Sequence, residues 1–105
     1  MKVVSPVGKQ LKIEVYGIPE SAHRCAGCHY LSKMLNELHL PFTFNEVITR
    51  DASGVVFNRP LIVTLAKRMN HPGLNIHYPV TFIDNVLFKS PSEVKAFLIK
   101  NNFDI

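Results

Sequence analysis

The chain has 105 residues, 47% hydrophobic and 19% charged, which is typical of one folded domain and excludes a disordered segment. Its net charge of +4 favours anionic partners, but the lysines and arginines are spread along the chain, which argues against nucleic-acid binding. No hydrophobic run approaches the about 20 residues of a membrane span, and we see no signal peptide at the N-terminus. We therefore expect residues 1–105 to form a single cytoplasmic domain that is monomeric and binds no membrane.

The first predicted elements are a strand and a helix. Residues 11–16 alternate hydrophobic and polar side chains, which predicts a strand that Gly17 ends. Residues 1–10 precede it as an extension, in which an additional edge strand is an open alternative. From residue 25 to about 39, hydrophobic side chains recur at helical spacing, and Pro41 stops this predicted helix.

The middle of the chain repeats this order. Residues 42–47 alternate again and predict a second strand. Residues 48–58 contain a polar, glycine-bearing stretch and are interpreted as a loop. Pro60 suits a first helical turn, and hydrophobic residues at helical spacing carry a second helix to Met69, before His71-Pro72-Gly73.

The last third of the chain predicts a hairpin and a final helix. Residues 80–83 and 86–88 flank Asp84-Asn85, a pair that tolerates positive φ in a two-residue turn. Residues 90–93 (Ser-Pro-Ser-Glu) have the sequence of a capping box that starts a helix. The order β-α-β-α-β-β-α predicts an α/β fold, in which a mixed four-stranded sheet is flanked by helices.

The two cysteines form a C-x-x-C motif, Cys25-Ala26-Gly27-Cys28, at the start of the first predicted helix. This spacing brings the two sulfur atoms close enough for a disulfide. The free N–H groups and the partial positive charge of the helix N-terminus stabilise a thiolate on the first sulfur. The second thiol can then attack a mixed disulfide and release the partner, so the motif predicts thiol–disulfide exchange.

Three alternatives for this motif remain open. The first is attachment of a c-type haem, because His29 follows the pair directly and Met69 could serve as the second axial ligand. The second is structural zinc in a binding module, held by a set of four ligands: Cys25, Cys28, His71 and His77. The third is a pair of buried, inert thiols. The alternation of strands and helices argues against haem, and the flanking Arg24 argues against inert burial.

Three stretches carry a resemblance to a known family. Val15-Tyr16-Gly17 leads through an approach segment into His23-Arg24-Cys25-x-x-Cys28, Pro41-Phe42-Thr43-Phe44 forms the second strand, and Tyr78-Pro79-Val80-Thr81-Phe82 opens the third. With these stretches the chain resembles the glutaredoxin family of the thioredoxin fold, most of all its small phage-encoded members. The likeness covers about residues 11–100.

The resemblance implies a glutaredoxin-type oxidoreductase that reduces protein disulfides or glutathione-mixed disulfides and contributes to electron transport and cell redox homeostasis. Cys25 would attack the substrate disulfide, and Cys28 would resolve the mixed disulfide. Pro79 would follow a cis peptide bond and pack beside the cysteines, where the backbone of Tyr78 would pair with a bound thiol substrate. The implied reductant is glutathione or a thioredoxin reductase, and one implied protein substrate is ribonucleotide reductase. No bound cofactor or metal is expected.

Further residues are candidates for substrate binding. Arg24 adds a fixed positive charge before Cys25, and His23 adds one when it is protonated; with the net charge, Arg24 suits a carboxylate-bearing substrate. Glutaredoxins usually carry Gly-Gly and then Asp near the last helix, where they hold glutathione, but this chain has Lys-Ser-Pro-Ser at residues 89–92. The hydroxyls of Ser90 and Ser92 are candidates to bind a carboxylate at the helix N-terminus, with plain helix capping as the alternative.

Overall fold

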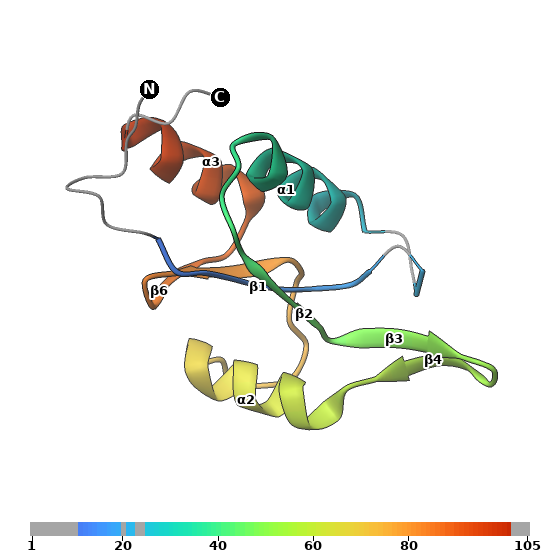
Figure 1. Ribbon diagram of the computed structural model, residues 1–105. Helices are drawn as coiled ribbons and strands as arrows, with labels where there is room; N and C mark the ends of the chain where they lie inside the picture. Colours follow the sequence, from blue (N-terminus) through green and yellow to red (C-terminus); the bar gives the residue numbers. More distant parts are fainter. Residues whose placement is uncertain (1–10, 20, 23–24, 102–105) are drawn as a thin grey trace.

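The computed structural model describes residues 11–19, 21–22 and 25–101, which form a sheet between two helical layers (Figure 1). The predicted order of strands and helices is confirmed, with one additional hairpin after the second strand of the sheet. The N-terminal extension, residues 1–10, lies outside the described residues, and so does the edge strand considered for it.

The central sheet has four strands in the order β2-β1-β5-β6, and the predicted mixed sheet is confirmed. β1 (Ile13–Gly17) pairs in parallel with β2 (Thr43–Glu46) and antiparallel with β5 (Val80–Ile83). β5 turns back antiparallel into β6 (Val86–Phe88). Both residues of that turn have positive φ angles, 49° and 69°, as the predicted hairpin requires.

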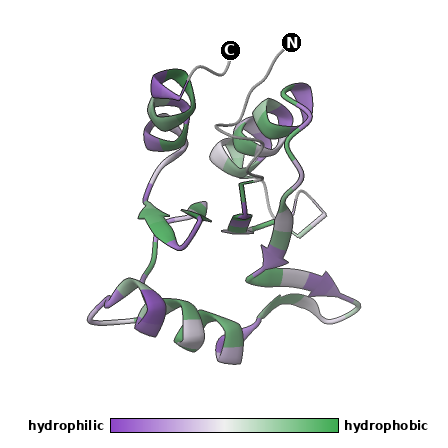
Figure 2. Cartoon of the chain, turned by 60° about the vertical axis from the view of Figure 1, so that its left-hand side comes forward, coloured by the Kyte–Doolittle hydropathy of each residue, from purple (hydrophilic) through white to green (hydrophobic). Residues whose placement is uncertain are grey.

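Helices cover both faces of the sheet. α1 (Ala26–Glu37) and α3 (Pro91–Lys100) lie on one face, and α2 (Arg59–Met69) lies on the other (Figure 1). Each helix mixes hydrophobic and polar residues, as expected for helices that bury one side (Figure 2). None of the helices in the described part of the chain is long and hydrophobic enough to cross a membrane.

Two hydrophobic clusters join these layers. The cluster under α1 and α3 consists of eight buried residues: Ile13, Val15, Leu31, Met34, Leu35, Ile83, Val94 and Leu98. The cluster over α2 also has eight: Tyr16, Val47, Ile62, Leu65, Ala66, Ile76, Val80 and Phe82. Since successive side chains of a strand point to opposite faces, the sheet contributes to both clusters.

The prediction of a loop over residues 48–58 is wrong, because most of this segment is a second, two-stranded sheet. β3 (Ile48–Asp51) pairs antiparallel with β4 (Gly54–Phe57). The Asp51 carboxylate accepts hydrogen bonds from the Ser53 N–H (2.8 Å) and hydroxyl (2.7 Å), which stabilises the turn. Gly54 has a φ of 119°, which side chains disfavour. The polar stretch of the expected loop forms only the turn, and the β-branched residues on both sides of it form the two strands.

Val47 anchors this hairpin to the central sheet. Its side chain is fully buried in the cluster over α2. Its N–H donates to the carbonyl of Gly17 at 3.0 Å, and its own carbonyl accepts from the Asn58 N–H at 2.8 Å. The hairpin therefore extends from a fixed point at the end of β2.

Arg68, near the end of α2, ties that helix to the sheet. Its guanidinium donates two hydrogen bonds of 2.9 Å to the Glu14 carboxylate, one of 3.1 Å to the Tyr16 hydroxyl and one of 3.0 Å to the Asn85 side chain. It also lies 3.7 Å from the centre of the Phe82 ring. The bidentate ion pair and the ring contact together fix the position of α2.

Candidate active site

Cys25 and Cys28 form a disulfide at the N-terminus of α1, with 5.3 Å between their Cα atoms. Cys25 is the N-cap residue, in extended conformation, and its sulfur accepts a hydrogen bond from the Cys28 N–H at 3.2 Å. The sulfur of Cys25 therefore occupies the place where a capping oxygen normally satisfies a free helical N–H. The same N–H and the helix dipole stabilise negative charge on Cys25 after reduction.

The two cysteines differ in exposure. Cys25 is half-buried, whereas Cys28 is only 2% exposed. The Cys28 sulfur accepts a hydrogen bond from the Ile18 N–H at 3.4 Å. A Cβ atom on Gly17 would lie 3.1 Å from this sulfur and 3.0 Å from the Phe44 ring, so the absent side chain at Gly17 leaves room for Cys28. Cys25 is therefore the more accessible of the two cysteines.

Pro79 packs against the residue between the cysteines. The Tyr78–Pro79 peptide bond is cis, as the resemblance implied, and Pro79 is buried. A Cβ atom on Gly27 would lie 3.0 Å from Cδ of Pro79 and 3.6 Å from Cγ of Pro91. Gly27 thus lets the start of α1 approach both prolines, which brings β5 and α3 next to the disulfide.

We expect Gly27→Val to disturb this junction. The added isopropyl group must displace rigid proline rings, so overpacking is expected to cost about 1–3 kcal/mol of stability. A small shift of Cys25 is expected to lower the rate of disulfide reduction about tenfold or more. Thermal unfolding and a disulfide-reduction assay measure these effects. Ala26→Val is the matched control, because it adds the same branched side chain at the neighbouring, exposed helical position. Equal activity in both variants would contradict the expectation.

Ser90 caps α3, next to this junction. Its hydroxyl accepts from the Glu93 N–H at 3.2 Å, and the Glu93 carboxylate accepts from the Lys89 N–H at 2.9 Å. The predicted start of the helix is confirmed, and the capping role of Ser90 is the one observed. Ser92 is exposed in the first turn of the same helix. Whether either serine binds a substrate stays a prediction.

The other candidate substrate-binding residues occupy different positions. Tyr78 is half-buried and packs against the cluster over α2, and this burial raises the pKa of its phenol. The backbone of Tyr78 lies just before β5, which starts at Val80. His23 and Arg24 lie outside the described residues.

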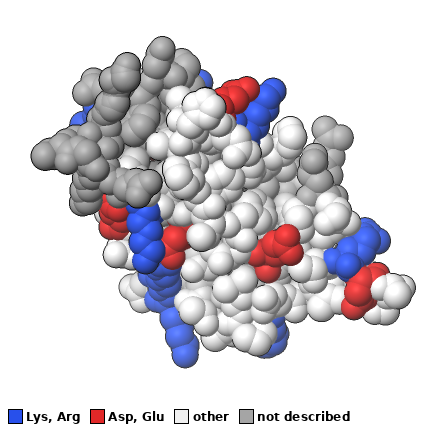
Figure 3. Space-filling model, viewed as in Figure 1, with Lys and Arg blue, Asp and Glu red and all other residues white. Residues whose placement is uncertain are grey.

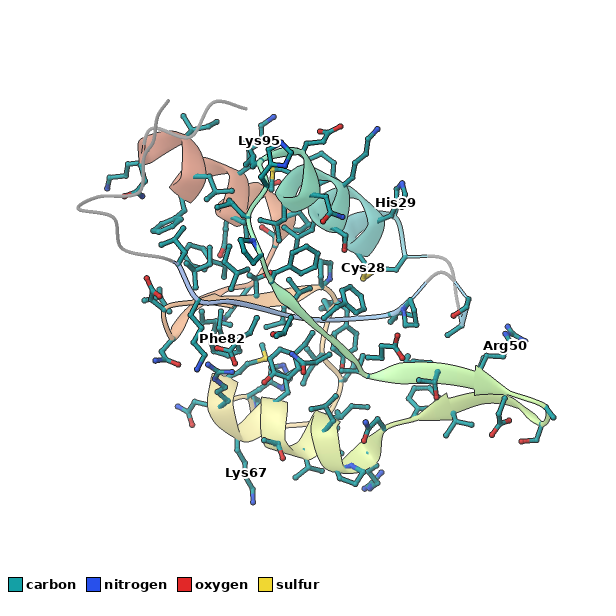
Figure 4. All side chains as sticks on the ribbon, in the orientation of Figure 1. Cys28, His29, Arg50, Lys67, Phe82 and Lys95 are labelled. Atoms are coloured by element: carbon teal, nitrogen blue, oxygen red, sulfur yellow. A yellow bond between two sulfur atoms is a disulfide. The ribbon has the colours of Figure 1, made fainter. Side chains whose placement is uncertain are left out.

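A shallow hollow of about 260 Å³ opens beside Cys28, lined by Ile18, Pro19, Cys28, His29, Ser32 and Phe44. His29 and Ser32 also line a second hollow, of about 390 Å³, which continues along the exposed side of α1. Cys28 and His29 point in different directions from α1 (Figure 4). The surface next to the disulfide is therefore concave on the side of the first turns of α1.

Comparison with known proteins shows which family the chain belongs to. No family model matches it. An uncharacterized 11.8 kDa protein of Enterobacteria phage T4, named for its position in the Gp55-nrdG intergenic region, is 48% identical over 96 residues, which cover 91% of this chain and 93% of that protein. The chain belongs to the family of this phage protein.

The fold of this chain is that of glutaredoxins. The crystal structure of glutaredoxin 1 from Francisella tularensis, complexed with cacodylate, matches with a TM-score of 0.56 over 86% of this chain and 94% of that one. The sequence identity is 18%, so the likeness concerns the fold. The expected thioredoxin-like fold is therefore confirmed.

The structure separates the residues of the two metal alternatives. His29 is exposed on α1, whereas Met69 packs in the cluster on the opposite face of the sheet, so they do not form an axial pair. Among the residues that the structure describes, no three His, Cys, Asp or Glu side chains converge on a metal-binding position. The zinc set is therefore not brought together, and His71 instead contacts the backbone of Gly73.

Three features of the site were not predicted. Gly17 and Gly27 were assigned to a strand end and to the motif, but their close contacts depend on Phe44, Pro79 and Pro91, which are distant in sequence. A small residue between the two cysteines was the available signal for Gly27. No sequence pattern predicts the hydrogen bond from Arg50 in β3 to the carbonyl of Ala22, because the two residues are 28 positions apart and belong to different segments.

Proposed function

We propose that this protein is a glutaredoxin-type thiol–disulfide oxidoreductase of the reducing cytoplasm. The observation that carries the proposal is the Cys25–Cys28 disulfide, with a half-buried Cys25 at the N-cap of α1 and a buried Cys28 behind it. The packing of Gly27 against Pro79 supports it, because it holds the segment that starts β5 next to the pair. The glutaredoxin-like fold is consistent with this activity.

The proposed reaction begins with the reduced protein. The Cys25 thiolate attacks one sulfur of a substrate disulfide, and the other sulfur leaves as a thiolate that takes up a proton. Cys28 loses its proton and attacks the Cys25 sulfur of the mixed disulfide, which forms the Cys25–Cys28 disulfide and releases the second substrate thiol. Two electrons pass from the protein to the substrate, and a thiol or dithiol reductant returns two electrons to the protein.

Several groups are proposed to hold the substrate. The Tyr78 backbone and Pro79 would pair with the segment that carries the attacked sulfur. His23, Arg24 and the hydroxyls of Ser90 and Ser92 would bind its carboxylate. Glutathione or a thioredoxin reductase is the proposed reductant, and ribonucleotide reductase is the protein substrate to test first.

The test is reduction of insulin by dithiothreitol, followed by turbidity with and without the protein. We expect catalysis well above the uncatalysed rate. Two coupled assays then identify the electron donor: glutathione with glutathione reductase, and thioredoxin reductase with NADPH. A rate equal to that without protein, for both insulin and bis(2-hydroxyethyl) disulfide, would reject the proposed activity.

A further inference from the structure

The β3–β4 hairpin exposes hydrophobic side chains away from the core. Val55, Val56 and Phe57 are 44%, 40% and 64% exposed. The hairpin projects from the three-layered body on the side where the segment before α1 lies (Figure 1). Val55 and Phe57, two residues apart on β4, lie on the same face of the hairpin, and Val56 lies on the other face. Exposed hydrophobic side chains that lie together mark an interaction site more often than scattered single residues do.

One face of the hairpin is directed toward the approach to the cysteines. Ile48 pairs with Phe57 and Arg50 with Val55, so these four side chains share a face. From this face the Arg50 guanidinium donates a 3.1 Å hydrogen bond to the carbonyl of Ala22, three residues before Cys25 (Figure 4). The exposed side chains of Val55 and Phe57 therefore continue the surface that leads to Cys25.

We infer that this surface, formed by Arg50, Val55 and Phe57 and called here the hairpin face, binds a hydrophobic segment of the protein whose disulfide Cys25 attacks. The inference rests on the proposed function and specifies its substrate class: a protein disulfide flanked by hydrophobic residues. A small disulfide needs only the groups around Cys25 and Pro79, so it gains nothing from the hairpin face.

The size and charge of the hairpin favour a segment of a substrate protein over a second copy of this chain as the bound partner. A stable dimer uses about 20–30 residues on each side, whereas the hairpin spans only residues 48–57, which suits the small interfaces of transient redox encounters. The tip of the hairpin carries both a basic and an acidic residue, Arg50 and Asp51, and the surface between the hairpin and the helices is mainly uncharged (Figure 3). Val55 and Phe57 therefore offer hydrophobic contact on a surface with few charges.

The experiment compares two substrates in matched variants. The test variant is Val55→Thr with Phe57→Thr, which removes hydrophobic surface but keeps residues that favour strands. The control is Val86→Thr with Ile99→Thr, at positions 57% and 54% exposed on other elements. We expect the test variant to raise the KM for insulin at least about fivefold and to keep turnover of bis(2-hydroxyethyl) disulfide within about twofold of wild type. The control is expected to match wild type with both substrates.

Each other outcome overturns the inference in a distinguishable way. Equal insulin kinetics in the test and control variants would show that the hairpin face binds no substrate, with the proposed function intact. Equal loss with both substrates, together with a lowered Tm, would show a structural role only. A wild-type dimer that the test variant dissociates in sedimentation would assign the face to a second copy. Failure of the wild type with both substrates would remove the proposed function, and the inference with it.

Discussion

Replacing Cys25 with serine is expected to abolish disulfide reduction, with a loss of about a thousandfold or more. Cys25 is half-buried at the helix N-cap, where the Cys28 N–H stabilises its thiolate, and a serine hydroxyl in the same place is not ionised at neutral pH. Insulin reduction measures the loss. Circular dichroism should show an unchanged fold, because the serine hydroxyl can accept the same capping hydrogen bond.

Cys28→Ser is the matched control for this prediction. It keeps the attacking thiol, so the variant should still form a mixed disulfide with a small disulfide, but it should fail to resolve one formed with a protein. Mass spectrometry detects the trapped adduct. In the reduced wild-type protein, limiting iodoacetamide should label Cys25 first, because Cys28 is only 2% exposed. Preferential labelling of Cys28 would reverse the two roles.

Arg68→Met is expected to lower the free energy of unfolding by about 2 kcal/mol, or the Tm by roughly 10 °C. The change keeps the hydrocarbon packing but removes four hydrogen bonds and leaves the Glu14 carboxylate, whose side chain is 16% exposed, without its cation. Lys67→Met is the control, since it removes the same charge from the same helical turn at an exposed position (Figure 4). Equal losses in the two variants would show that the network contributes nothing specific.

The same ion pair predicts a pH dependence of stability. Hydrogen bonds from Arg68 hold the pKa of the Glu14 carboxyl below its ordinary value of 4.5, although burial opposes this shift. Glu14 therefore contributes its stability above about pH 4.5, and the contribution is lost as the pH falls through the lower pKa of the folded state. Urea unfolding of wild type and Glu14→Gln should converge in stability as the pH falls below 4.5. A difference that stays constant would contradict this assignment.

The hairpin at residues 48–57 shows where prediction from the sequence failed. The polar stretch at residues 51–54 indicates a loop over the whole segment, because the flanking strands are four residues long and bury little and so lack the alternation of the strands of the central sheet. What holds it in place is not local: the buried Val47 at its base and the bond from Arg50 to Ala22, 28 residues away in sequence. A single sequence contains no signal for such contacts.

The sequence by itself determined the order of the central strands and helices, the turn at Asp84-Asn85, the cap at Ser90 and the position of the C-x-x-C pair, because each depends on residues within one or two helical turns or strand repeats. The resemblance placed Pro79 beside the cysteines, but only the tertiary structure decided which small residues allow the close packing and how α2 is joined to the sheet. Gly17 meets Cys28, Gly27 meets Pro79, and Arg68 meets Glu14 across 54 residues. These contacts arise when separate elements pack face to face, and packing depends on the whole shape of the core rather than on any local pattern.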